Sequence, residues 1–188
     1  MNKKTITLFC GHAGSGKDYN CNGMYNAINE DSGIEGVAMK IKFAEPIVAL
    51  AAKITKQKLK NKFIYEKWKK NKDNRQMLID IGWGMKESFG DSIFGIYARK
   101  RIVEADDNVT HFLISDFRFL EELDPLRELK GYNINIFFCD YHSERYDDSM
   151  RDKSEDLPRI LKKANAPVNT PMDLTTFYEL YYSAAKHI

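Results

Sequence analysis

Short apolar runs of strand length alternate with longer segments of helical periodicity along most of the chain. The runs at 5–10, 37–43, 111–115 and 133–139 are rich in β-branched or aromatic residues and predict buried strands. A shorter run at 166–169 predicts a fifth strand. Strands that alternate with helices favour an α/β fold with right-handed crossovers. We therefore expect a parallel five-stranded sheet with helices on both faces.

The segments between these strands predict the helices. Pro46 is a helix-opening signal and Gly131 a helix-closing one. The predicted helices cover 17–29, 46–55, 58–73, 75–87, 92–105, 119–130, 154–164 and 173–186. Ligands of α/β sheets bind at the carboxyl ends of the strands, so the functional loops are expected to follow Cys10, Phe43, Ser115 and Cys139.

Composition and charge narrow the class of protein. The 188 residues are 43% hydrophobic and 30% charged, which suits a single globular domain spanning 1–188. The sequence has no run of about 18 apolar residues, so no membrane span is predicted. The three cysteines do not have the spacing of a metal site. A reduced, cytoplasmic protein is the expectation. The net charge of +2 argues against bulk binding to nucleic acid or to anionic lipid.

The strongest motif follows the first predicted strand, where Gly11-His12-Ala13-Gly14-Ser15-Gly16-Lys17-Asp18 matches the pattern G-x-x-x-x-G-K. In such a loop the backbone N–H groups point at phosphate oxygens, the following helix adds its positive end, and the lysine bridges the outer phosphates. We therefore predict that these eight residues bind the phosphates of ATP and that Lys17 is catalytic. The alternative is an ordinary glycine-rich turn between a strand and a helix.

Asp18 departs from the usual form of this motif. Ser or Thr normally places a hydroxyl on Mg²⁺ at this position. A carboxylate could bind that ion directly or through water, so Mg²⁺ is still expected, with Asp18 as a candidate ligand.

Several short motifs, in order along the chain, resemble those of one family. Gly11–Asp18 is similar to a G-x-x-x-S-G-K-D loop, although Tyr19 stands where that family has Thr. The other matching segments are Phe43–Pro46, Arg75–Gly82, Phe89–Asp91, Ile114–Phe119 with Glu121 and Glu122, and Ser154–Glu155. Together they resemble the bacteriophage-type deoxynucleoside monophosphate kinases, in the adenylate-kinase-like group of P-loop kinases. Residues 56–72 and those beyond about 172 match nothing in this pattern.

The resemblance implies a three-layer P-loop NTPase (nucleotide kinase) fold. It implies transfer of the γ-phosphoryl group of ATP to a deoxynucleoside monophosphate, with ATP and Mg²⁺ as cofactors. A homodimer located in the cytoplasm of a phage host is the accompanying expectation. The alternatives are a kinase for a ribonucleotide or a phosphorylated cofactor precursor, and a nucleotide-binding regulator or ATPase.

The resemblance also implies substrate-binding residues, each with a plainer structural alternative. Arg75 would hold the acceptor phosphate, unless it is a surface arginine, and Arg118 would meet phosphate. Asp116 would hold the Mg²⁺ water shell or the acceptor sugar, unless it forms a buried pair with Arg118. Phe43 would flank the acceptor base, unless it belongs to the core. Glu121, or its neighbour Glu122, would accept hydrogen bonds from the base or sugar.

Two charged segments complete the prediction. A lid loop at about 140–154 carries Arg145 and Arg151, which by resemblance would close over the triphosphate as catalytic residues; the alternative is a solvated loop. A turn at 169–171 would seat adenine. Between Lys53 and Arg75, ten basic residues stand against two acidic ones, with three aromatics interleaved. Nucleic-acid binding is one interpretation, but we favour a helical insert at about 53–105 that attracts nucleotides to the acceptor site.

Overall fold

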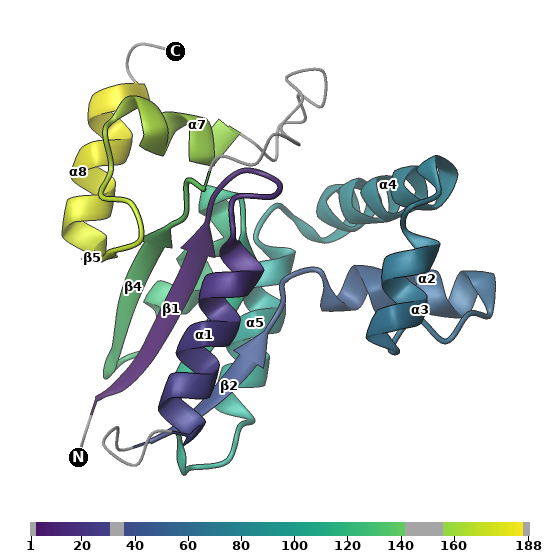
Figure 1. Ribbon diagram of the computed structural model, residues 1–188, viewed down its shortest axis with the longest axis horizontal. Coiled ribbons are helices and arrows are strands. Elements are labelled where there is room, and N and C mark those ends of the chain that lie inside the picture. Colours follow the sequence, from purple (N-terminus) through teal and green to yellow (C-terminus); the bar gives the residue numbers. More distant parts are fainter. Residues whose placement is uncertain (1–2, 31–35, 142–155, 186–188) are drawn as a thin grey trace.

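The computed structural model describes residues 3–30, 36–141 and 156–185 and has an α/β architecture built on one sheet (Figure 1). The strands are β1 (Lys4–Cys10), β2 (Val37–Ile41), β3 (Val109–Phe117), β4 (Tyr132–Phe138) and β5 (Pro171–Asp173). Their order across the sheet is β2-β3-β1-β4-β5. β1 pairs in parallel with β3 and β4, and β2 pairs in parallel with β3. The four longer strands therefore confirm the predicted parallel arrangement.

The fifth strand corrects the sequence prediction. It lies at Pro171–Asp173 and not at 166–169, and it runs antiparallel to β4. The backbone N–H of Asn169 donates to the carbonyl of Phe138 at 2.8 Å, so the chain returns to the sheet at the carboxyl end of β4. A parallel strand would need a crossover back to the opposite end. The sheet is therefore mixed.

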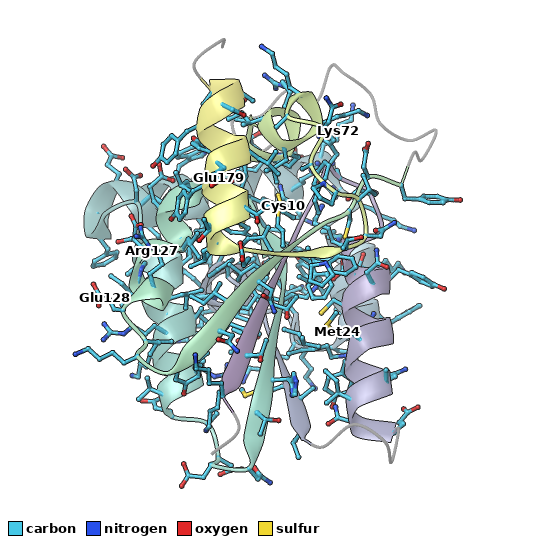
Figure 2. All side chains as sticks on the ribbon, turned by 90° about the vertical axis from the view of Figure 1, so that its left-hand side faces the viewer. Cys10, Met24, Lys72, Arg127, Glu128 and Glu179 are labelled. Carbon is cyan, nitrogen blue, oxygen red and sulfur yellow. The ribbon has the colours of Figure 1, made fainter. Side chains whose placement is uncertain are left out.

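Side chains of β1 alternate between the two faces of the sheet and define three layers. Ile6 and Leu8 face a core that also contains residues of α5 (Ile93–Val103), α6 (Asp124–Arg127), α7 (Asp156–Lys163) and α8 (Leu174–Ala185). Phe9 faces the other side, where α1 (Lys17–Glu30) packs on the sheet. Figure 2 shows the strands between α1, whose Met24 points at the sheet, and α8 with α6.

Three helices lie beside the sheet (Figure 1). They are α2 (Glu45–Thr55), α3 (Lys62–Trp68) and α4 (Lys72–Phe89), and α2 packs against α4. The predicted helix over 58–73 is shorter than expected because two asparagines cap new helices. Asn61 accepts from the N–H of Ile64, and Asn71 accepts from those of the first turn of α4.

The predicted helix over 119–130 is interrupted. It consists of a 3₁₀ turn, Leu120–Glu122, followed by the short α6. Glu122 turns its side chain back to the N–H groups of Arg118 and Phe119, and Pro125 has no N–H to continue the earlier turn. The other predicted helices are confirmed to within a few residues at their ends. No described helix has the length and apolar character that crossing a membrane requires.

Candidate functional site

The loop between β1 and α1 needs glycine for two separate reasons. Gly14 and Gly16 have φ of 80° and 86°, in the left-handed region that favours glycine. A Cβ on Gly11 would overlap the carbonyl oxygen of Cys139 and the Oγ of Ser15. The loop is therefore packed closely against the end of β4, and its path depends on the glycines that the motif requires.

The side chain of Lys17 folds back into this loop. Its Nζ donates to the carbonyl oxygens of Gly11 at 2.5 Å and His12 at 2.6 Å, and the residue is 9% exposed. Lys17 is also the first residue of α1, whose N-terminus carries partial positive charge. An ammonium group and a helix N-terminus thus meet at one point, which favours an anion there.

Ser15 adds a polar group with no partner. It is 2% exposed, and its hydroxyl has no hydrogen-bond partner among the described residues. Its carbonyl accepts from the N–H of Tyr141 at 3.3 Å, and the N–H of Cys139 donates to the carbonyl of Cys10 at 2.7 Å. The residues after β4 therefore fix the loop, while the buried hydroxyl of Ser15 stays without a hydrogen-bond partner among the described residues.

Asp18 forms a small cluster with residues from β3 and from the end of β2. Its Oδ1 accepts from the Nζ of Lys42 at 3.0 Å and from the hydroxyl of Ser115 at 3.0 Å. Burial would raise the pKa of Asp18, but the Lys42 ammonium and the two hydrogen bonds outweigh burial and lower it. Asp18 is therefore an ionised carboxylate beside the loop.

This cluster has donor atoms that suit Mg²⁺. The carboxylate of Asp18 and the hydroxyl of Ser115 are oxygen ligands of the kind that Mg²⁺ prefers. Among the described residues there is no group of three or more His, Cys, Asp and Glu side chains placed to hold a metal. The residues fit an ion that keeps most of its water and takes one protein carboxylate.

The structure gives Asp116 a clear structural role. Its Oδ1 accepts from the N–H of Phe43 at 2.9 Å and its Oδ2 from that of Ala44 at 3.0 Å. Burial raises the pKa of Asp116, against the two backbone hydrogen bonds that lower it. The carboxylate thereby ties the end of β3 to the turn before α2. Its contact with Mg²⁺ or with the acceptor sugar stays a prediction, and both of its carboxylate oxygens already accept backbone hydrogen bonds.

Phe43 lies in the core. It is 2% exposed and its ring lies 6.4 Å from that of Phe117. This position matches the plainer reading of the residue, and contact with an acceptor base stays untested. The backbone of the 43–44 turn, and not the ring, is what meets Asp116.

A pocket of about 330 Å³ opens at the carboxyl end of β3. Its walls come from α4, from the segment after β3, and from α7 and α8. The lining residues are Trp83, Lys86, Asp91, Arg118, Phe119, Leu120, Glu121, Asp156, Leu157, Ile160 and Tyr181. Two predicted acceptor residues, Arg118 and Glu121, therefore line the same pocket.

The pocket lies close to the glycine-rich loop. In the sheet, Cys10, which directly precedes that loop, pairs with Phe117, which directly precedes Arg118. The pocket and the loop therefore begin at the ends of neighbouring strands.

Lys86, which lines this pocket, and Glu122, which follows the lining residue Glu121, have 6% and 3% of their surfaces exposed. The Nζ of Lys86 lies 3.3 Å from the centre of the Phe119 ring. The Oε2 of Glu122 accepts from the N–H groups of Arg118 and Phe119, both at 3.1 Å. Burial raises the pKa of Glu122 to about 8, against these hydrogen bonds and the charge of Lys86, which lower it. Glu122 thus fixes the backbone that presents Arg118.

The remaining predictions concern Arg75, the two arginines of the lid, and the turn at 169–171. Arg75 lies on the first turn of α4, is exposed, and does not line the described pocket. Arg145 and Arg151, like most of the predicted lid, lie outside the described residues. The 169–171 turn reaches α1, because the Nδ2 of Asn20 lies 3.3 Å from the Oδ1 of Asn169. The predicted adenine turn is therefore adjacent to the helix that follows the glycine-rich loop.

Sequence reasoning missed four residues of this region. The motifs of the sequence do not mark Lys42 or Lys86, they mark Ser115 only as a strand end, and they offer Glu122 only as the neighbour of Glu121. Ser115 ends a predicted strand, and a polar residue at a strand end is a signal for a functional position. Lys42 and Lys86 stand among many other lysines, and only the folded chain separates them from the rest.

Comparison of the chain with models of known protein families and with curated proteins finds no match in either set.

Proposed function

We propose that this protein is a nucleotide kinase that transfers the γ-phosphoryl group of ATP to a deoxynucleoside monophosphate. In this proposal the fold is a three-layer P-loop kinase fold and the loop from Gly11 to Asp18 is its phosphate loop. The observation that carries the proposal is the arrangement around Lys17: a buried ammonium, a helix N-terminus and the unpartnered hydroxyl of Ser15 converge on one loop. The ordered family-like motifs add the second line of support.

ATP would bind with its phosphates at this loop. Backbone N–H groups of the loop and the start of α1 would contact the phosphate oxygens, and Lys17 would turn from its loop carbonyls toward the outer phosphates. Asp18 and Ser115 would hold the water shell of Mg²⁺, which neutralises charge on the phosphates. The 169–171 turn beside Asn20 is the candidate site for adenine.

The acceptor would bind in the pocket lined by Arg118 and Glu121. Arg118 directly follows β3, the strand next to β1, so its backbone lies near the start of the phosphate loop. Its guanidinium group suits a phosphate oxyanion. An oxygen of the acceptor phosphate would attack the γ-phosphorus, and the bond from that phosphorus to the bridging oxygen of ADP would break. Such transfer needs mainly positioning and cationic stabilisation, which this pair of adjacent sites would supply.

The test is ADP formation from ATP and Mg²⁺ across a panel of acceptors. The panel contains the deoxynucleoside monophosphates, the ribonucleoside monophosphates, and phosphorylated alcohols and cofactor precursors, with a DNA-only arm. We expect ADP and a diphosphate product with at least one deoxynucleoside monophosphate. Product only with a non-nucleotide acceptor, or ATP hydrolysis stimulated only by DNA, would contradict the proposal.

A further inference from the structure

The ammonium group of Lys86 lies in the pocket and has no hydrogen-bond acceptor among the described residues. It is 6% exposed and lines the pocket. Its Nζ lies over the rings of Phe119, at 3.3 Å from the centroid, and Trp83, at 5.6 Å. Among the described residues it has no hydrogen-bond or ion-pair partner. Ring faces attract a cation, but they do not replace the oxygen atoms that an ammonium group binds in water.

Glu122 does not supply the oxygen atom that the Lys86 ammonium lacks. It is the buried carboxyl group that acts electrostatically with Lys86, yet its Oε2 already accepts from two backbone N–H groups. The described chain therefore gives this ammonium group no oxygen partner, and Lys86 lines the pocket, so a ligand that displaces pocket water can supply one.

The rest of the pocket suits a flat ring. Trp83 and Phe119 lie edge to face with their ring centres 5.9 Å apart, and Leu157 and Ile160 add apolar surface. If Arg118 holds the acceptor phosphate near the phosphate loop, the aromatic part of the pocket is left for the base. This step rests on the proposed function.

We propose that Lys86 is a specificity-determining residue of the acceptor pocket and that its ammonium donates a hydrogen bond to a carbonyl oxygen of the base. A base with a keto group at this position satisfies the buried ammonium. A base with an amino group there turns a donor toward a donor and leaves Lys86 unsatisfied. Keto bases therefore bind more tightly than the amino bases of the same ring system.

Two purine nucleotides isolate this contact. Deoxyinosine monophosphate and deoxyadenosine monophosphate differ in the keto or amino group at position 6 and in the proton on the adjacent ring nitrogen. Binding is followed by Trp83 fluorescence in a Trp68→Phe background, which leaves Trp83 as the only tryptophan. We expect the inosine nucleotide to bind about 10–100-fold more tightly. The same direction is expected for deoxyuridine over deoxycytidine monophosphate.

Three variants in that background separate specificity from folding. Lys86→Met should bring the two affinities to within about threefold by weakening the keto nucleotide, whereas Lys86→Arg, which keeps a donor, should retain the preference. Lys130→Met changes an exposed lysine outside the pocket and should leave the preference intact. Thermal melts check that each variant is folded.

Binding needs no phosphoryl transfer, so the two proposals can fail separately. Equal affinities in the parent protein, or an unchanged preference in folded Lys86→Met, would overturn the role of Lys86 even if the protein is a kinase. A keto preference that depends on Lys86, in a protein that transfers no phosphoryl group, would support the pocket and contradict the kinase. A pocket that binds none of the four nucleotides contradicts both the role of Lys86 and the proposed acceptor site.

Discussion

Two buried lysines stand at the two halves of the site, and their surroundings are opposite. Lys17 is 9% exposed and donates to two carbonyl oxygens of its own loop. Lys86 is 6% exposed and faces aromatic rings, with no acceptor among the described residues. One cation is hydrogen-bonded by the backbone that presents it, whereas the other has aromatic rings and no hydrogen-bond acceptor among the described residues.

The difference suggests how the two sites work. A loop that satisfies its own lysine stays organised before any ligand binds, which suits a site for a common ligand such as a phosphate chain. An unsatisfied buried donor instead discriminates, because it rejects every ligand that lacks the matching oxygen. Single substitutions can change one side of this comparison while leaving the other intact.

The largest effect is expected for Gly11→Ala, which disrupts the Lys17 side. The added Cβ would overlap the Cys139 carbonyl and the Ser15 hydroxyl, and the first of these is backbone that cannot rotate away. We expect a loss of about 3 kcal/mol in unfolding free energy and loss of ATP binding, measured by urea denaturation and nucleotide titration. Gly23→Ala is the matched control, because Gly23 lies in α1, the helix that follows this loop, and a Cβ there meets nothing within 4 Å. Equal stability of the two variants would contradict this packing.

Replacing each lysine by methionine tests the comparison directly. Lys17→Met should lower the unfolding free energy by about 1–3 kcal/mol, because two buried carbonyls lose their charged donor. Lys86→Met should leave it unchanged or raise it, because a cation with no hydrogen-bond acceptor in the described chain is replaced by an apolar chain of similar length. Urea denaturation without nucleotide measures both. If Lys86→Met is the more destabilising of the two, the ammonium has a partner and the comparison fails.

Glu122→Gln tests the electrostatics of the pocket side. Burial raises the pKa of Glu122 from 4.5 to about 8, so between these pH values the folded protein holds a proton that the unfolded chain releases. The stability contributed by Glu122 is therefore complete below about pH 4.5 and declines as the pH rises to about 8, by at most about 1.4 kcal/mol per pH unit. Glutamine keeps a backbone acceptor without titrating. The stability of the wild type relative to Glu122→Gln should fall across this range, and parallel pH profiles would contradict the burial argument.

A small loss of stability is expected for Asp18→Asn. Its ion pair with Lys42 is exposed on both sides, so its loss should cost less than about 1 kcal/mol in urea denaturation. If Asp18 holds Mg²⁺, the same variant should need more Mg²⁺ for half-maximal activity. An unchanged Mg²⁺ dependence would remove Asp18 from the proposed metal site.

Local signals made the Lys17 side predictable from the sequence. The glycines, the lysine and the start of α1 are adjacent in the chain, and their spacing encodes the geometry. The four parallel strands were equally accessible, because each is a short apolar run with a clear boundary. β5 was not, because Pro171–Asp173 becomes a strand only by pairing with the end of β4.

The pocket side could be predicted only in part, since its parts are brought together by tertiary contacts. Arg118 and Glu121 follow a strand end and could be anticipated, whereas Lys86 becomes distinctive only when Phe119 packs beneath it. The structural role of Asp116 likewise depends on the turn at Phe43 and Ala44, far away in sequence. Pairings of this kind leave no local pattern.

The central claim is that Lys17 serves phosphoryl transfer between two nucleotides. The most direct measurement compares wild type and Lys17→Met in ADP formation from saturating ATP, Mg²⁺ and the best deoxynucleoside monophosphate, with both proteins shown to be folded. The account predicts that the variant loses about 10²–10³-fold in kcat, as expected when one preorganised charge-stabilising donor is removed. Unchanged turnover in Lys17→Met would contradict it.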